Sequence, residues 1–151
     1  MIVWTPQTRL RNVFAKALHH GHVRNAELGP STPEQIASRL SSGEECIVIV
    51  RDKKQRTLWM TDRRLLREDG SAVTELFAFS AVNRVHWMAR ERPWEVSKRD
   101  NFDRLEIDLM SGETREVTLD ELDQAVFPLH SFLQWLARKR LPDVEPAIRN
   151  L

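Results

Sequence analysis

The first 42 residues are patterned as two helices. Thr5 and Pro6 suit a helix start, because a threonine hydroxyl caps the first turn and proline fits the first helical position. Apolar side chains then recur at helical spacing, at Leu10, Val13, Phe14, Ala17 and Leu18. Gly21 predicts the end of this helix, because glycine takes the left-handed conformation without a Cβ penalty. A second, short helix is predicted after the capping-box sequence of residues 32–35 (TPEQ), ending near Gly43.

From Glu44 onwards the pattern becomes extended, and seven short strands are predicted. Polar or glycine-containing turns separate these strands, which span 45–51, 56–61, 63–68, 73–79, 82–89, 104–110 and 113–119. The first of them (ECIVIVR) is a β-branched run typical of a buried strand. The last two alternate cleanly, with Leu105, Ile107 and Leu109 on one face. Residues 90–102 are charged and contain a proline, so a long loop is predicted there.

One amphipathic helix is predicted to follow, from about Ala125 to Arg140. Its apolar face follows the i, i+3, i+4, i+7 pattern, at Leu129, Phe132, Leu133 and Leu136. Leu141-Pro142 is predicted to stop the helix, since proline lacks a backbone donor and clashes with the preceding turn. The tail at 142–151 is then expected to be loosely held.

This order of elements predicts an α+β fold. A run of antiparallel strands must hide its edges, and closing into a β-barrel does so. One apolar-faced helix then covers an open end or corner. The predicted organisation is an N-terminal helical extension at 1–42, a seven-stranded antiparallel barrel with its capping helix at 43–141, and a tail at 142–151. The N-terminal helix is expected to pack either on its own barrel or on that of a neighbouring molecule.

Residues 43–140 resemble the pleckstrin-homology (PH) superfold, and more closely the bacterial PH-like and GRAM-like domains. Three features carry the resemblance: Gly43-Glu44 before the first strand, the hairpin signature of residues 58–65 (LWMTDRRL), and the aromatic segment of residues 77–85 (FAFSAVNRV). Trp135 also falls on the closing helix, where the PH fold favours a tryptophan. The resemblance implies a seven-stranded bent barrel capped by a C-terminal helix. In lipid-binding members of the superfold, basic residues around the first hairpin loop hold inositol phosphates.

The hairpin signature is interpreted mainly as turn chemistry. Asp62 is expected to cap its own turn by accepting hydrogen bonds from nearby backbone N–H groups. Because successive strand residues alternate, one of Arg63 and Arg64 must face outward. The signature is therefore predicted to mark the fold and to supply no chemistry.

Composition changes this picture little. The chain has 151 residues, a formal net charge of +1 and one cysteine. Such a small net charge gives no global field that would attract nucleic acid or membrane, so nucleic-acid binding is not expected. No apolar run approaches the length of a membrane span, and the start lacks the apolar core of a signal peptide. Cys46 lies in an apolar strand and fits a small buried side chain in a reducing compartment, so the cytoplasm is the expected location.

The sequence contains no familiar catalytic motif: it has no G-x-S-x-G, no P-loop and no dinucleotide-binding fingerprint. We therefore expect no enzymatic activity and no cofactor. His19, His20 and His22 invite a metal interpretation, but they flank Gly21, and histidine suits a helix C-terminus. Helix termination is the favoured interpretation, and no metal site is expected.

The first candidate binding loop holds Lys53, Lys54 and Arg56. Lysine and arginine provide the charge-assisted contacts that phosphate recognition requires. Asp52 interrupts this basic set, and a simply solvated, lysine-rich hairpin loop is the other interpretation.

The second candidate loop spans 90–102 and holds Trp94 among charged residues that include Arg92. An aromatic side chain between arginines is typical of a contact with a partner or a membrane interface. The other interpretation is that Trp94 folds back on the barrel.

The leading hypothesis is a non-enzymatic PH-like module for binding or assembly. A sheet edge, the loop at 90–102 or self-association would provide the contact with a protein partner, since exposed strand edges accept added strands. The alternative is recognition of an anionic lipid or phosphate ligand through Lys53, Lys54 and Arg56, at the periphery of an anionic membrane.

Overall fold

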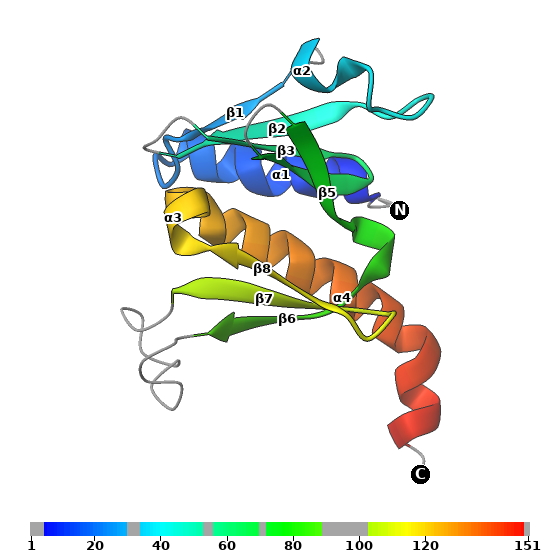
Figure 1. Cartoon of the computed structure of the whole chain (residues 1–151). Coiled ribbons are helices and arrows are strands. Elements are labelled where there is room, and N and C mark those ends of the chain that lie inside the picture. Colours follow the sequence, from blue (N-terminus) through cyan, green and yellow to red (C-terminus); the bar gives the residue numbers. More distant parts are fainter. Residues whose placement is uncertain (1–4, 30–33, 53–55, 70–71, 89–102, 150–151) are drawn as a thin grey trace.

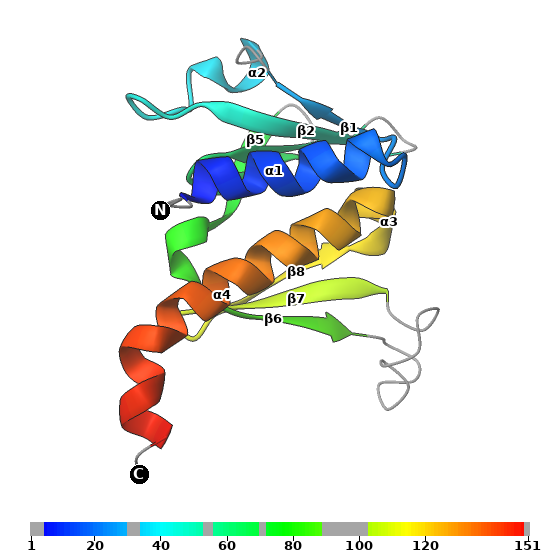
Figure 2. The same ribbon diagram turned by 180° about the vertical axis from the view of Figure 1, so that it is seen from behind.

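The computed structural model describes residues 5–29, 34–52, 56–69, 72–88 and 103–149. Two antiparallel sheets and two long helices, α1 (Pro6–His19) and α4 (Val126–Arg149), dominate this part of the chain (Figure 1). α1 lies against β1 and β2, α4 lies against β6, and the two helices pack against each other. Figure 2 shows both helices side by side on one side of the molecule.

The first sheet has five strands in the order β1-β2-β3-β4-β5, each antiparallel to its neighbour. They span Ala26–Leu28 (β1), Cys46–Arg51 (β2), Thr57–Thr61 (β3), Arg64–Asp69 (β4) and Ala72–Ala78 (β5). One face joins the main core. On the other face, α2 (Glu34–Ala37) covers a smaller apolar cluster around Trp59. Burial on both faces explains why β2 is apolar along almost its whole length.

The second sheet has three strands in the order β6-β7-β8, spanning Val82–Met88 (β6), Arg104–Leu109 (β7) and Thr114–Thr118 (β8). The 3-10 turn η1 (Phe79–Ala81) carries the chain into it from β5. The predicted alternation of β7 is confirmed, with Leu105, Ile107 and Leu109 buried. Arg115 of β8 donates from Nε to the carbonyl of Leu76 at 3.1 Å, which links the second sheet to β5.

The prediction of a closed barrel of seven strands is wrong in two respects. The described residues form eight strands, because β1 pairs with β2 from Ala26↔Val50 to Leu28↔Val48. β1 has three residues, too few to show an alternation in the sequence. These eight strands form two separate sheets and no closed barrel, because the chain leaves the first sheet at η1. The coarser prediction, an α+β fold with a C-terminal helix, is confirmed.

α1 begins and ends as predicted. The Thr5 hydroxyl accepts the N–H of Thr8 at 3.2 Å, and Gly21 has a φ of +72° just after the helix. Leu10 and Phe14 are fully buried in the same core cluster as the residues of α4. α1 therefore packs on its own chain.

α4 follows the short α3 (Leu119–Leu122) and the 3-10 turn η3 (Asp123–Ala125). Its predicted buried face is confirmed, since Leu129, Phe132, Leu133 and Leu136 all belong to the main core. The predicted stop at Leu141-Pro142 is wrong: the helix continues past the proline to Arg149 and extends beyond the sheets (Figure 1). Proline has a fixed φ that is itself helical, so it removes a donor without forcing an end. No helix among the described residues is long and apolar enough to cross a membrane.

Candidate functional site

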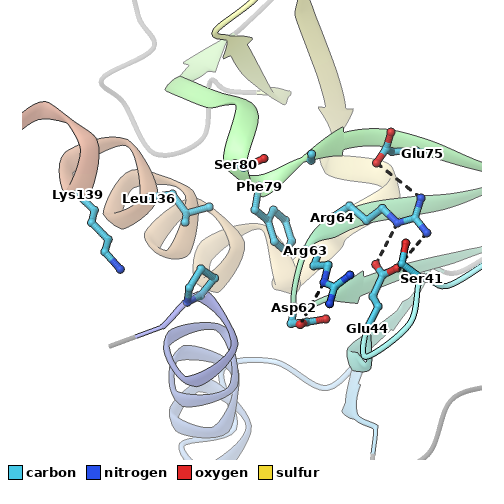
Figure 3. Close-up of a pocket in the computed structure, with 12 residues that line it drawn as sticks. Ser41, Glu44, Asp62, Arg63, Arg64, Glu75, Phe79, Ser80, Leu136 and Lys139 are labelled. Carbon is cyan, nitrogen blue, oxygen red and sulfur yellow. Dashed lines mark hydrogen bonds and ion pairs between the residues drawn. The ribbon is translucent and has the colours of Figure 1, made fainter. Parts of the chain in front are cut away.

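Gly43-Glu44 and the hairpin signature of residues 58–65 meet around the carboxylate of Glu44 (Figure 3). Glu44 lies just before β2, and its side chain is fully buried. Its two oxygens accept a bidentate pair from Arg64 (Nε and Nη2, 3.0 Å each) and the Thr61 hydroxyl at 2.6 Å. The N–H of Ser41 adds a hydrogen bond at 2.9 Å. The charge of this buried carboxylate is therefore fully compensated.

Thr61 organises the turn between β3 and β4. Its hydroxyl oxygen accepts the N–H groups of Arg63 and Arg64, both at 3.0 Å. The prediction that Asp62 caps this turn is therefore wrong. Its carboxylate accepts the N–H of Glu45 at 3.0 Å, and its own N–H donates to the Glu45 carbonyl at 3.1 Å. Asp62 thus clamps the turn to the chain that enters β2.

Both arginines of the signature reach the segment before β2, since Arg63 donates from Nη2 to the carbonyl of Ser42 at 3.2 Å, but they differ in exposure. The side chain of Arg63 is 50% exposed, whereas that of Arg64 is 21% exposed and turned toward Glu44. Arg64 also lies 3.7 Å from Glu75 of β5. One guanidinium therefore connects the loop before β2, the β3–β4 turn and the neighbouring strand β5.

The electrostatics of this network oppose acid–base chemistry. Burial by itself would raise the pKa of Glu44, but the hydrogen bonds from Arg64, Thr61 and Ser41 outweigh it and hold that pKa below its ordinary value. The Glu44 carboxylate in turn raises the pKa of Arg64. A general base needs a pKa near the working pH and room for the proton it takes. Glu44 has neither, so its carboxylate is not poised to act as a general base.

A pocket of about 700 Å³ opens beside the network. Residues of the β3–β4 turn, the β5–η1 segment, the start of α1 and α4 form its walls (Figure 3). Three carboxylates and three cations line it, at Glu44, Asp62, Glu75, Arg63, Arg64 and Lys139. The formal charges of the lining therefore balance. Its described lining contains no histidine or cysteine that could act as a base or nucleophile.

Of the predicted phosphate-binding residues, Lys53 and Lys54 lie outside the described residues, and Arg56 is described. Arg56 donates from Nε to one oxygen of Asp52 at 2.6 Å and from its backbone N–H to the other at 2.8 Å. The Asp52 side chain is 2% exposed. Asp52, which interrupts the basic set in the sequence, therefore bonds to Arg56 across the loop. Its carboxylate already compensates the charge of Arg56, which reduces what Arg56 can offer to a phosphate.

The other sequence candidates form no reactive site among the described residues. Trp94 and Arg92 lie outside them. The three histidines at the end of α1 are exposed, with neighbouring rings 5.3 and 5.9 Å apart. In the part of the chain that is described, no group of three or more His, Cys, Asp or Glu side chains is arranged to hold a metal ion. Burial raises the pKa of the Cys46 thiol to about 11, which leaves almost no thiolate near neutral pH.

A groove between α1 and α4, which we call the helix groove, was not predicted. It has a volume of about 630 Å³. Part of its lining is apolar, from Val13, Ala17, Val23, Phe127 and Pro128. Arg9, Lys16 and His22 line it as well, and no carboxylate is among its described lining residues. Phe127 is 46% exposed, which is unusual for a side chain of this size.

Phe127 belongs to an aromatic cluster that fixes its place. The ring of Trp87, on β6, lies 6.0 Å from that of Phe127 and stacks on His130 at 4.3 Å. Burial, together with the nearby charge of Arg138, lowers the pKa of His130 and keeps its ring neutral at neutral pH. The exposure of Phe127 is therefore built into the packing of α4 on the second sheet.

Comparisons of the chain with protein-family models, with curated proteins and with solved structures find no match. The helix groove must therefore be interpreted from its own geometry. No periodicity could have revealed it, because its lining comes from residues 9–23 and 124–131, at opposite ends of the chain. The one sequence signal was the absence of carboxylates from both segments.

Proposed function

We propose that the protein is a non-enzymatic binding or assembly module, and that a protein partner docks in the helix groove. The observation that carries this proposal is Phe127, an aromatic side chain that is 46% exposed and lines a groove that the described residues leave open. Apolar patches bordered by polar groups are typical of protein interaction surfaces. The network around Glu44 supports a non-enzymatic role, because its polar groups are committed to one another.

The proposal includes a PH-like, or more narrowly GRAM-like, fold. Two antiparallel sheets followed by a long helix support it. The ion pair between Glu44 and Arg64 also supports it, because it joins two of the features that carry the resemblance, Gly43-Glu44 and the hairpin signature. We propose the cytoplasm as the location, since Cys46 is a buried free thiol.

A photo-crosslinker at position 127 is expected to capture the partner. Phe127→p-benzoylphenylalanine keeps an aromatic ring at a half-exposed position, so the packing against Trp87 is retained. Irradiation in cells that make the protein should give a covalent adduct of discrete, higher mass on a denaturing gel. Mass spectrometry of the adduct then identifies the partner.

Met110 offers the matched control, because it is 62% exposed and lies in the β7–β8 turn rather than in the helix groove. The same crosslinker at Met110 is expected to give none of the adducts seen at position 127. The absence of an adduct at 127, or the same adducts at both positions, would contradict the proposed function.

The alternative function is recognition of an anionic lipid or phosphate through the first hairpin loop. The positions of Lys53 and Lys54 in the sequence support this alternative. We rank it below the docking of a protein partner, because Arg56 is already paired with Asp52. Sedimentation with phosphatidylserine vesicles tests it at low and high salt. We expect no salt-sensitive binding through this loop. Binding that the double variant Lys53→Glu/Lys54→Glu abolishes would favour the alternative.

A further inference from the structure

We infer that the helix groove binds an acidic, amphipathic helical segment of a partner protein. The apolar side of that segment would cover Phe127 and the apolar lining, and its carboxylates would lie beside Arg9 and Lys16. This inference rests on the proposed function and adds the chemical class of the partner. Two features carry it: the sign of the charge on the two helices and the shape of the groove between them.

Positive charge is concentrated on the segments that contain α1 and the first part of α4, and two of the cations concerned, Arg9 and Lys16, line the groove itself. Residues 5–26 and 124–142 contain seven of the 23 Lys and Arg residues of the chain and none of its 22 Asp and Glu residues. The seven are Arg9, Arg11, Lys16, Arg24, Arg138, Lys139 and Arg140. Since the whole chain carries only +1, the remainder is net negative. The small net charge therefore conceals an excess of basic residues on these two segments, which favours an acidic partner. Arg11 is paired with Glu45 and does not add to this excess.

The structure brings some of these cations from the two helices together. The Cζ atom of Arg9 lies 5.9 Å from the centroid of the Trp135 ring, and the Nζ atom of Lys139 lies 4.9 Å from it. A cation–π contact positions a side chain and keeps its charge. Lys16 is exposed and lies about two helical turns after Arg9 on α1. Positive charge thus extends along the groove and onto the adjoining part of α4.

The shape of the groove favours a peptide segment. A concave surface with an apolar lining takes the side chains of one helix face, with anchors at i, i+3, i+4 and i+7. A flat bilayer does not follow a concavity between two helices, and a phosphodiester backbone has no apolar side chains to bury. The neutral polar residues of the lining, Asn12, Gln124 and Ser131, do not repel carboxylates.

A second copy of this chain is a poorer occupant. It would have to dock its own acidic surface in the groove of the first copy, so the contact would join two different surfaces. Such a head-to-tail contact does not close into a two-fold dimer and tends to continue into chains. A separate partner with an acidic amphipathic helix satisfies the same chemistry without that consequence.

Fluorescence anisotropy with two labelled probe peptides tests the inference on the full chain. Both probes are helical peptides with leucine at i, i+3, i+4 and i+7; one has glutamate at its flanking positions and the other has lysine. The acidic probe is expected to bind, to weaken as salt is added and to bind at least tenfold better than the basic probe. Lys16→Glu and Phe127→Ser should each weaken it about tenfold.

Arg84→Glu and Met110→Ser are the matched controls, because both residues are exposed and neither lines the groove. They should leave the binding of the acidic probe unchanged, and melting temperatures show that all four variants are folded. Failure of the acidic probe to bind, equal binding of both probes, or unchanged binding in Lys16→Glu would each overturn the inference.

The crosslinker at position 127 distinguishes a failure of this inference from a failure of the proposed function. If adducts persist at 127 while the acidic probe fails, the groove has a partner of other chemistry; if there are no adducts, the function itself fails. Two further results would also overturn the inference by naming another occupant. One is vesicle binding that Lys16→Glu abolishes, and the other is a dimer in light scattering that Phe127→Ser abolishes.

Discussion

Glu44→Ala is expected to lower the free energy of unfolding by about 3–5 kcal/mol, because it removes the bidentate partner of Arg64 in a largely buried site and leaves Glu75, at 3.7 Å, as the remaining carboxylate. The same change frees the Thr61 hydroxyl, the hub of the β3–β4 turn, from its bond to the carboxylate. Urea unfolding monitored by tryptophan fluorescence measures the loss, and Trp59 on β3 is a buried reporter.

The adjacent residue provides the control for this prediction. Glu45 is 50% exposed and pairs with Arg11 at 3.2 Å on the surface. An exposed pair of this kind contributes about 0–1 kcal/mol, so Glu45→Ala should have a small effect. Equal effects of Glu44→Ala and Glu45→Ala would show that the buried pair is not what holds the turn.

The pH dependence of stability gives a second measure of the Glu44 network. The pKa of Glu44 is lower in the folded protein than its ordinary value of 4.5, so the folded state binds this proton less readily than the unfolded state does. The resulting contribution to stability is fully present above pH 4.5 and is lost as the pH falls through the folded pKa. Glu44→Gln cannot titrate there. The difference in stability between the natural protein and Glu44→Gln should therefore shrink in acid; a constant difference would contradict the lowered pKa.

The strands could be predicted where their signal is local. β7 shows its buried and polar faces in six consecutive residues, and no information from elsewhere in the chain is needed to find it. β1 depends on tertiary contact instead, because three residues become a strand only by pairing with β2. The expectation of a closed barrel rests on the rule that closure hides strand edges. In the structure the edges of β2 and β5 have partners without closure. β1 pairs along the edge of β2, and Arg115 donates a hydrogen bond to the carbonyl of Leu76 on β5.

The hairpin signature illustrates what a local pattern contains and what it omits. Alternation predicts that one of Arg63 and Arg64 faces outward, but it cannot decide which of them is the more buried. That choice depends on Glu44, twenty positions earlier in the sequence, whose buried carboxylate needs a cation. The turn is likewise capped by Thr61 rather than Asp62 because Asp62 is engaged by the backbone of Glu45.

The sequence points to candidate binding residues in loops, where charges cluster within a few positions. The helix groove has no such cluster, because its cations are spaced along α1 and its exposed aromatic comes from the first turn of α4. Only the packing of α1 on α4 turns these scattered positions into one surface (Figure 2). The proposed site therefore depends on how strongly α1 packs on the rest of the fold. Phe14, a fully buried side chain of α1, allows this packing to be tested.

Phe14→Ala is expected to lower the free energy of unfolding by about 3–5 kcal/mol, the usual cost of removing a fully buried phenylalanine side chain. Alanine is a better helix former than phenylalanine, so a loss of stability must come from the packing of α1 on the core and not from the helix itself. Chemical denaturation measures the effect. Lys16→Ala, at an exposed position of the same helix, should stay within about 0.5 kcal/mol.

The same variant separates two ways in which α1 could be attached. If α1 and the sheets unfold together, Phe14→Ala shifts the midpoint of a single transition and leaves its steepness unchanged. If α1 is only loosely attached, the variant releases the helix, a shallow early transition appears and crosslinking at position 127 is lost while the sheets stay folded. We expect the first outcome, because Leu10 and Phe14 lie in one continuous core with Phe132 and Leu133 of α4. A groove formed by such a helix is a fixed feature of the fold, preorganised for a partner.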